Sequence, residues 1–377
     1  MLKRDTIKTQ MSQLEKLKDF FGSFQKENRF LGVDIGTSSI KVVQLKKEKE
    51  RGVLETYGEI SLSSYGGGEV GRSAILGPDK LKEAISDIIK EAKVSAKNAV
   101  LSVPLRNSFL TVMRMPRIPD DELKDAIPYE ARKYIPVPLS DVIVDWWVLP
   151  ASSKERAESS IGSGTRDFVE VFLAAVPRDI IEKHKTVFSE LGFENLFFEI
   201  EPFSFARSSL RRDLGTVLLM DVGAKSVKFA IADGGAVRAS HNFEKGSQEI
   251  SLAISQSLSV DFERAEFFKR DIGLMRSPET EGVTKIIEPV VDMINEEGER
   301  FLLDWKKRGG ETINKVIVGG GGAMLKNLND SIIKKYGVEV ETAHPFSKVV
   351  YPAFLERPLL EIGSTFANAI GLALKNF

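Results

Sequence analysis

The alternation of apolar and polar positions predicts β-strands and tight turns from residue 30 onward. In the segment RFLGVDIGTSSIKVVQLKK (29–47), two runs rich in apolar and β-branched residues meet at Gly36, which is typical of a β-hairpin. Further strands are expected at 99–103 and 109–113, and the spacing of Leu and Ile over 79–93 predicts a helix before them. This alternation of strands and helices indicates an α/β fold.

The first 29 residues have a different character, because they are highly charged and carry Leu and Phe at near-helical spacing in the run LEKLKDFFGSF. We expect an amphipathic helix or extension here (1–29), outside the main fold. Its apolar face is short, so three roles remain open: packing on the body of the protein, adsorption to a membrane surface, or docking with a partner.

The middle of the chain, 106–196, is predicted to be an inserted α/β subdomain. A helix expected over 122–134 is interrupted by Pro128, which should kink or restart it because proline lacks an N–H donor. Strands are expected at 142–149 and 168–176, and the polar segment between them should form a mobile loop.

The most informative pattern is an internal repeat. DIGTSSIK at 34–41 recurs as DVGAKSVK at 221–228, with Asp, Gly, Ser and Lys identical and Ile or Val at the other two apolar positions. The copies are separated by about half of the chain, which is too far for a solenoid and fits a duplicated domain. We therefore expect two lobes, with the first-lobe core at 30–105 and the remainder of the core at 197–377.

A strand–Asp-x-Gly–turn–strand unit suits phosphate binding. The aspartate stands at the end of a strand, and the glycine lets a ligand approach the N–H groups of the turn. Single turns of this kind are common without any ligand, but two matched copies that face one another can clamp a polyphosphate. We predict this role for both turns, with the two aspartates also holding a hydrated Mg²⁺ through water: Asp34, Gly36, Thr37, Ser38, Asp221, Gly223, Ala224 and Lys225.

A third glycine-rich element, VIVGGGGAMLKNL (316–328), follows a strand-like run and leads into a helical pattern. It carries neither the Walker P-loop spacing nor the Rossmann G-x-G-x-x-G spacing. Its glycines permit a flat ligand to lie against the backbone, and three of them are candidate nucleotide contacts: Gly320, Gly321 and Gly322. Farther on, small residues at steps of four over 363–371 favour tight helix packing over indirect support of a phosphate loop.

Composition removes several classes of function. Lys and Arg total 53 against 54 for Asp and Glu, which gives a net charge of −1. The composition therefore lacks the excess of positive charge that is typical of nucleic-acid-binding proteins. The absence of cysteine excludes disulfides, thiolate nucleophiles and Cys-based metal sites, and favours a cytosolic protein. The three histidines are far apart in sequence, and no apolar stretch is long enough to span a bilayer or to form a signal peptide.

Five motifs, in order, resemble those of the actin-like ATPase superfamily over residues 30–377: DIGTSSIK, EPFSFA, DVGAKSVK, the glycine quartet and the C-terminal helix. The resemblance implies two related lobes that close over ATP and Mg²⁺. Several members of the superfamily carry an Ala-Glu-x-x-Lys-type helix that touches the ribose. The match in ERAEFFKRDIG implies the same role for Glu266 and Lys269.

Hydrolysis of ATP needs a group that orients or deprotonates water, and candidates are few. Glu201 in EPFSFA lies where heat-shock chaperones carry a Glu-Pro, which makes it the candidate catalytic residue. A structural role at the start of a helix, with a proline in the first turn, explains it equally well. The second turn also has fewer hydroxyl groups than the first. We expect an ATP-binding protein with slow or absent turnover.

A narrower resemblance comes from ELKDAIPYEARKYIPVPLSDVIVDWWVL (122–149), which is similar to the inserted subdomain of the PilM family, the cytoplasmic actin-like components of type IV pilus machinery. SVPLRNSFLTVMRMPRIPDDEL and VEVETAHPFSKV also match that family. The resemblance implies a cytoplasmic scaffold recruited to the inner face of the inner membrane. The alternatives are an FtsA-like cell-division protein, a filament-forming actin homologue and, less favoured, a small-molecule kinase.

The insert carries many large apolar groups and is the predicted partner-binding unit. A groove in it would suit an extended peptide, and the PilM resemblance implies that this peptide is the cytoplasmic N-terminal tail of PilN, with other pilus platform proteins as further partners and the oligomeric state open. Trp146 and Trp147 are adjacent on one strand and point to opposite faces, so both are buried only if both faces are covered. The residues assigned to the groove are Tyr129, Tyr134, Ile135 and Pro136.

Overall fold

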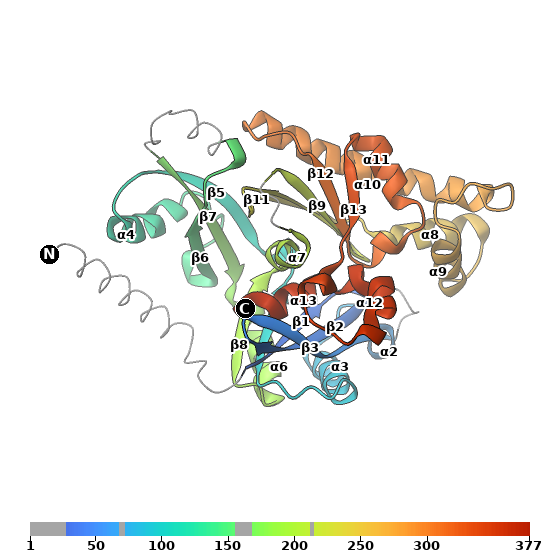
Figure 1. Cartoon of the computed structure of the whole chain (residues 1–377), viewed down its shortest axis with the longest axis horizontal. Coiled ribbons are helices and arrows are strands. Elements are labelled where there is room, and N and C mark those ends of the chain that lie inside the picture. The colour runs from blue at the N-terminus through green and yellow to red at the C-terminus, as the bar shows by residue number, and fades with distance from the viewer. Residues whose placement is uncertain (1–27, 68–71, 155–167, 212–214) are drawn as a thin grey trace.

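The computed structural model describes residues 28–67, 72–154, 168–211 and 215–377, and Figure 1 shows three β-sheets with helices around them. The expected N-terminal helix and most of the polar loop before residue 168 fall outside the described residues. The presence of both sheets and helices confirms the predicted α/β class.

The first large sheet contains the first copy of the repeat, and its strands in spatial order are β3 (Arg51–Ser61), β2 (Ser39–Glu48), β1 (Arg29–Ile35), β4 (Asn98–Val103) and β8 (Asn195–Ile200). The pairs β1–β2 and β2–β3 are antiparallel, whereas β4 pairs parallel with both β1 and β8. Apolar side chains cover both faces of this sheet. One face packs on α3 (Pro78–Glu91) and α6 (Arg178–Glu190), and the other packs on α13 (Ala367–Ala373).

The second large sheet repeats this arrangement, with the order β11 (Ala236–Phe243), β10 (Val227–Asp233), β9 (Val217–Val222), β12 (Lys315–Gly319) and β13 (Glu339–Thr342). The hairpins also share their register, because Asp34 pairs with Lys41 and Asp221 pairs with Lys228. The predicted duplication is therefore confirmed. One face of the sheet packs on four helices: α8 (Ser247–Leu258), α9 (Phe262–Asp271), α10 (Glu281–Lys307) and α11 (Leu328–Tyr336).

The insert forms a third sheet of three antiparallel strands in the order β5 (Phe109–Pro116), β7 (Phe168–Pro177) and β6 (Val142–Val148), with α4 (Asp120–Ala131) packed on one face. Pro128 lies inside α4, in its last turn, and the helix continues past it to Ala131. Trp147 stacks on Phe172 with ring centroids 4.7 Å apart, while Trp146 packs into the cluster under α4. The two tryptophans therefore lie on opposite faces of the sheet, and each is half-buried.

After β7 the chain returns to the first large sheet. Helix α6 packs against α3, and β8 pairs with β4. The sheet of the insert thus spans 109–177, inside the predicted range of 106–196. The division of the chain into 1–29, 30–105, 106–196 and 197–377 stays a prediction.

Two helices, α7 (Glu201–Ser209) and α13, lie against each other between the two large sheets (Figure 1). A Cβ at Gly371 of α13 would lie 1.8 Å from the carbonyl oxygen of Ser204 in α7. The small-residue stripe therefore serves tight helix packing at this position, as the sequence favoured.

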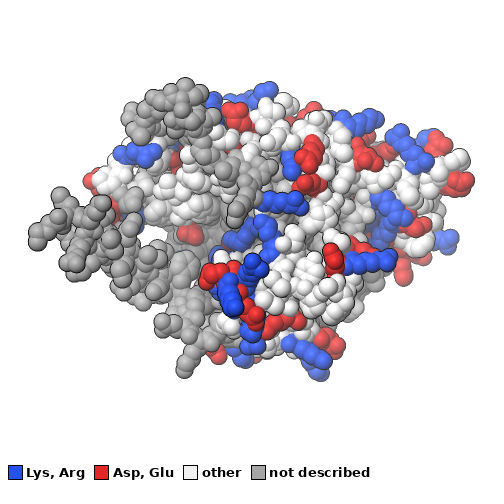
Figure 2. All heavy atoms as spheres, in the orientation of Figure 1, with Lys and Arg blue, Asp and Glu red and all other residues white. Residues whose placement is uncertain are grey.

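The remaining elements are short: α2 (Ser63–Gly66), α12 (Glu356–Ile362) and the 3₁₀ helices at Leu105–Asn107, Leu139–Asp141, Gly321–Met324, Pro345–Lys348, Ala353–Leu355, Gly363–Phe366 and Leu374–Asn376. Within the described part of the chain, no helix combines the length and apolar character needed to cross a membrane. Acidic and basic side chains are interspersed on the face that Figure 2 shows.

Candidate functional site

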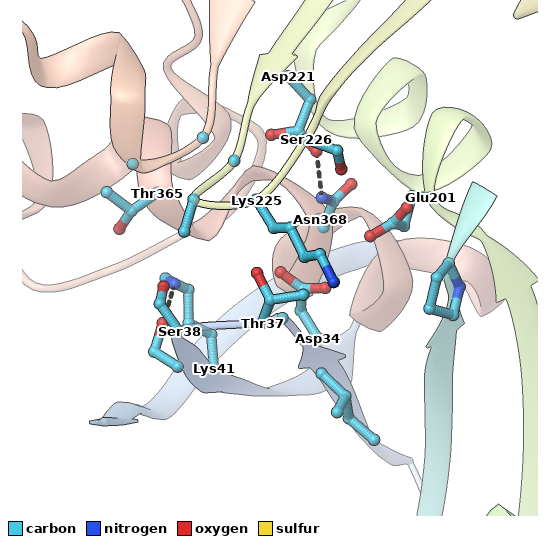
Figure 3. Close-up of a pocket in the computed structure, with 18 of the residues that line it drawn as sticks. Asp34, Thr37, Ser38, Lys41, Glu201, Asp221, Lys225, Ser226, Thr365 and Asn368 are labelled. Atoms are coloured by element: carbon cyan, nitrogen blue, oxygen red, sulfur yellow. Dashed lines mark hydrogen bonds between the residues drawn. The ribbon is translucent and has the colours of Figure 1, made fainter. Parts of the chain in front are cut away.

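A cleft of about 770 Å³ lies between the two repeated hairpins. Every residue that the sequence assigned to nucleotide contact or catalysis lines it: Asp34, Gly36, Thr37, Ser38, Glu201, Asp221, Gly223, Ala224, Lys225, Glu266, Lys269, Gly320, Gly321 and Gly322. Residues far apart in sequence thus meet in one cavity, with the first hairpin on one side and the second on the other (Figure 3).

The first turn presents free backbone donors to this cleft. Its glycine N–H, at Gly36, donates to the carbonyl of Ser39 at 3.1 Å, and a Cβ on Gly36 would lie 2.9 Å from that oxygen. The carbonyl of Thr37 accepts from the N–H of Ala74 at 2.7 Å. The N–H groups of Thr37 and Ser38 have no partner among the described residues, so they are available to an anion.

The second turn has the same construction. Gly223 N–H donates to the carbonyl of Ser226 at 3.0 Å, and a Cβ on Gly223 would lie 2.9 Å from that oxygen. Helix α8 starts beneath the turn, where Ser247 N–H donates to the Gly223 carbonyl at 2.9 Å. The N–H groups of Ala224 and Lys225 lack partners within the described residues. Each turn therefore offers two donors, which suits phosphate oxygens.

Two buried aspartates stand at the base of the turns. Asp34 is 8% exposed, and its Oδ1 has no hydrogen-bond partner within the described part of the chain. Burial, followed by repulsion from Glu201, raises the pKa of Asp34 to about 6. Asp221 is also buried and accepts from Asn368 Nδ2 at 3.0 Å, as Figure 3 shows.

This arrangement fits a hydrated magnesium ion. The unpartnered Asp34 oxygen is the acceptor that a water shell would satisfy. Among the described residues, no group of three or more acidic or histidine side chains could hold a metal directly. Contact of Asp34 and Asp221 with Mg²⁺ through water stays a prediction.

Glu201, the candidate catalytic residue, has both of its oxygens engaged. Oε1 lies 3.1 Å from Lys228 Nζ, and Oε2 accepts from the backbone N–H of Leu105 at 2.9 Å. Glu201 is buried and opens α7, with Pro202 in the first turn. These contacts favour the structural interpretation, because they hold the carboxylate at the start of α7.

Lys228 lies among three carboxylates, since its Nζ is also 3.5 Å from Asp221 Oδ2 and Asp34 is close by. Burial alone would lower the pKa of Lys228, but the charges of Glu201, Asp221 and Asp34 raise it above its usual value. The sequence missed this residue, although its place in both copies of the repeat was the available signal. It also missed Asn368, a polar position within the small-residue stripe.

The glycine run after β12 forms another wall of the cleft. Gly320 has a φ of +80°, and a Cβ there would lie 2.4 Å from Asp221 Oδ1. At Gly322, a Cβ would lie 2.2 Å from the side chain of Val222. Only Gly321 of these three has open space beside it. Close packing on the second hairpin thus explains two of the glycines, and the third leaves bare backbone for a flat ligand.

Glu266 and Lys269, on α9, form an ion pair at the cleft wall. Glu266 also accepts from Ser251 Oγ, and Lys269 Nζ donates to the carbonyl of Ser247 at 3.3 Å. Burial lowers the pKa of Lys269, against the raising effect of Glu266. Both side chains are thus held in place before any ligand arrives.

The residues assigned to partner binding do not all reach the surface. Tyr129 is 71% exposed, Tyr134 is 38% exposed, and Pro136 is exposed. Ile135 is only 6% exposed and packs in the core under α4. Its assignment to the partner surface is therefore corrected, because the subdomain uses this side chain for its own core.

A separate groove of about 700 Å³ lies between the insert and the first large sheet. It is lined on one side by Ile143, Asp145 and Trp147 of β6, and on the other by Phe198 of β8 and Phe203 of α7. In the described sheets, β6 and β8 are edge strands. The sequence did not predict this groove, because its walls come from strands that pair with different neighbours.

Comparisons with known proteins add to this geometry. A family profile described as "Type IV pilus assembly protein PilM" matches residues 32–377. A solved PilM–PilN type IV pilus biogenesis complex contains a chain that is similar with a TM-score of 0.74 and 23% identity, over 92% of this chain and 97% of that one.

Two other solved structures are similar at lower identity. The MreB 5 protein of Spiroplasma citri bound to AMPPNP has a TM-score of 0.55 and 14% identity, over 92% of this chain and 95% of that one. The ethanolamine utilization protein EutJ from Carboxydothermus hydrogenoformans has a TM-score of 0.51 and 15% identity, over 97% and 98%. These similarities confirm the predicted actin-like ATPase fold.

Proposed function

Because the chain belongs to the PilM family of type IV pilus assembly proteins, we propose that it acts in that assembly as a nucleotide-binding scaffold that holds an extended peptide of a PilN partner. The two matched turns carry the nucleotide part of this proposal, since they bring four unpartnered N–H groups to one cleft. The edge-strand groove supports the peptide part.

In this proposal the cleft binds ATP. The N–H groups of the two turns bind the phosphates, and the adenosine lies near Gly321 and the Glu266–Lys269 pair. When bound, Mg²⁺ supplies positive charge at the phosphates, and Asp34 and Asp221 hold its water shell. The unpartnered oxygen of Asp34 supports this assignment.

Slow or absent turnover is part of the proposal. The candidate base, Glu201, contacts Lys228 and the N–H of Leu105, and these contacts support a structural role for it at the start of α7. A site of this kind binds nucleotide and passes through few cycles of hydrolysis. The bound state then acts by favouring one arrangement of the lobes.

The groove between β6 and β8 is the proposed peptide site. β6 is an edge strand of its sheet, and an extended peptide can add to such an edge. Its alternate side chains would meet the apolar wall formed by Ile143, Trp147 and Phe203. One of the similar solved structures is a PilM–PilN complex, and we assign the N-terminal tail of PilN as the peptide on that basis.

Binding of such a tail would place the protein in the cytoplasm, at the inner face of the inner membrane. The exposed Tyr129, Tyr134 and Pro136 form a second surface on the insert that is open to other platform proteins or to a second copy of the chain. Neither of these contacts is needed for the peptide site.

Helix α7 would transmit the state of the cleft to the groove. Its first residue, Glu201, lines the cleft, while Phe203, Ala206 and Arg207 line the groove. A change of lobe arrangement that moves one end of this nine-residue helix must move the other. We therefore propose that nucleotide and peptide affinities are linked.

Fluorescence anisotropy with a labelled PilN tail peptide tests the peptide site. Ile143→Glu places a charge in the groove and should weaken binding about tenfold or more. Val148→Glu is the matched control, because Val148 is exposed on the same strand and does not line the groove. Equal affinity of both variants would contradict the assignment, and weakening by Tyr134→Asp alone would move the site to the second surface.

A further inference from the structure

The two lysines that end the repeated motifs have different surroundings. Lys41 Nζ lies 3.0 Å from Glu59 Oε1 on β3 and donates to Ser39 Oγ at 2.6 Å. Lys228 is 3.1 Å from Glu201 and 3.5 Å from Asp221. Lys41 is thus held by its own sheet, whereas Lys228 reaches across to a carboxylate of another element.

The third strand explains this difference. In the sheet register, Lys41 pairs with Glu59 on β3, and Lys228 pairs with Asn242 on β11. Glu59 holds the Lys41 ammonium group at the wall of the cleft, which both residues line. A neutral asparagine beside Lys228 leaves its ammonium free to turn toward the acidic side chains.

The Lys228 ammonium also lies beside the second turn. A Cβ on Gly223 would be 3.4 Å from Lys228 Nζ, so the charge sits at the glycine whose neighbours, Ala224 and Lys225, offer free N–H groups. The Lys228 side chain is 16% exposed, which limits screening by water. A phosphate oxygen bound by this turn would therefore meet a positive charge fixed to the protein.

We propose that Lys228 binds the phosphates of the nucleotide directly, as a cation carried by the chain, so that part of the nucleotide affinity persists without a divalent ion. This inference rests on the proposed nucleotide site and adds a residue that none of the matched motifs assigned to it. A lysine ammonium is a compact charge on a flexible stem. It can turn from Glu201 to a phosphate oxygen, while Glu201 keeps the N–H of Leu105.

Binding of ATP with Mg²⁺ and with EDTA, measured by calorimetry, tests the proposal. The unchanged protein should bind ATP in both conditions, more weakly with EDTA. Lys228→Met should lose about tenfold in affinity with EDTA, or about 1.4 kcal/mol, and less than about threefold with Mg²⁺. Lys228→Arg should keep most of the affinity with EDTA, since it keeps the charge.

Lys245→Met is the control, because it removes a lysine that pairs with Glu249 at the surface and does not line the cleft, and it should change neither affinity by more than about threefold. If Lys228→Met does not melt cooperatively, the double variant Glu201→Gln/Lys228→Met removes the unpaired charge as well, and the double variant should show the same selective loss with EDTA.

Three outcomes decide the matter. Equal losses with EDTA for Lys245→Met and Lys228→Met would overturn the proposal. So would the absence of ATP binding with EDTA in a protein that binds ATP with Mg²⁺. The absence of binding in both conditions would instead contradict the nucleotide site itself.

Discussion

The two hairpins of this protein share a backbone and differ in what lies beside them. Their strand order, register and turn geometry agree, including the 2.9 Å approach between a Cβ on either glycine and the carbonyl three residues on. Their third strands differ, with Glu59 beside one lysine and Asn242 beside the other. The two lysines thus share a place in the motif and differ in their neighbours outside it.

Valine at either turn glycine should have the largest effect. Gly36→Val and Gly223→Val each push a side chain into a carbonyl oxygen, so each should abolish the ATP-dependent rise in melting temperature. At an ATP concentration 100 times the dissociation constant, that rise corresponds to a stabilisation of the folded protein by about 2.7 kcal/mol. Gly282→Val in α10, where a Cβ meets nothing within 4 Å, is the control. A loss confined to one of the two turns would break the equivalence of the hairpins.

Replacement of each aspartate by asparagine should change the stability of the protein, with a different pH dependence in each copy of the repeat. The raised pKa of Asp34 means that the folded protein holds its proton more tightly than the unfolded chain does. Ionisation of Asp34 therefore destabilises the folded protein. This destabilisation is absent below about pH 4 and fully present above about pH 6. Asp34→Asn should stabilise the ligand-free protein by about 2 kcal/mol at pH 8 and by little at pH 4.

Asp221→Asn should show no such gain, because Asp221 is paired with Lys228 and bonded to Asn368. Urea unfolding across this pH range, in EDTA, measures both variants. An equal response of Asp34→Asn and Asp221→Asn would mean that the lysine contributes no asymmetry between the copies.

Exchange of the third-strand neighbours should sharpen the comparison further. Asn242→Glu gives Lys228 the neighbour that Lys41 has, so it should draw the ammonium from the cleft and weaken ATP binding with EDTA by roughly threefold to tenfold. Glu59→Gln is the reciprocal change and should matter less, because Lys41 keeps its bond to Ser39. Unchanged ATP affinity in Asn242→Glu would show that the third strand does not set the direction of Lys228.

Glu201→Gln should have the smallest effect on binding. Loss of its charge removes one partner of Lys228, so affinity for Mg-ATP should change by less than about threefold and affinity with EDTA should rise slightly. Phosphate release reports turnover in parallel. If the unchanged protein hydrolyses ATP and the variant retains all of that activity, Glu201 has only its structural role.

The cleft was predictable from sequence because its residues lie in short motifs whose local geometry is self-contained. Asp34 and Gly36 occupy one turn, Asp221 and Gly223 the other, and the repeat itself indicated that the two would face each other. The position of Lys228 was visible in both copies of the repeat, but the direction of its side chain was not predictable, since its neighbour on β11 lies outside the motif.

The partner surface shows the same limit. The sequence identified the insert and its apolar density, but hydrophobicity alone cannot separate Ile135, which fills the core, from Tyr129, which faces solvent. The groove between β6 and β8 depends on which strands end at a sheet edge. Whether a strand lies at an edge depends on how whole strands pair, so a short sequence segment does not reveal it.

The packing of α13 against α7 has a consequence for exchange with solvent. Gly371 leaves no space for even a methyl group beside Ser204, and a Cβ on Gly32 of β1 would lie 2.0 Å from the carbonyl of Ala369. Helix α13 is thus packed tightly against both α7 and β1. Amide protons of α13 should consequently be among the last in the molecule to exchange with deuterium.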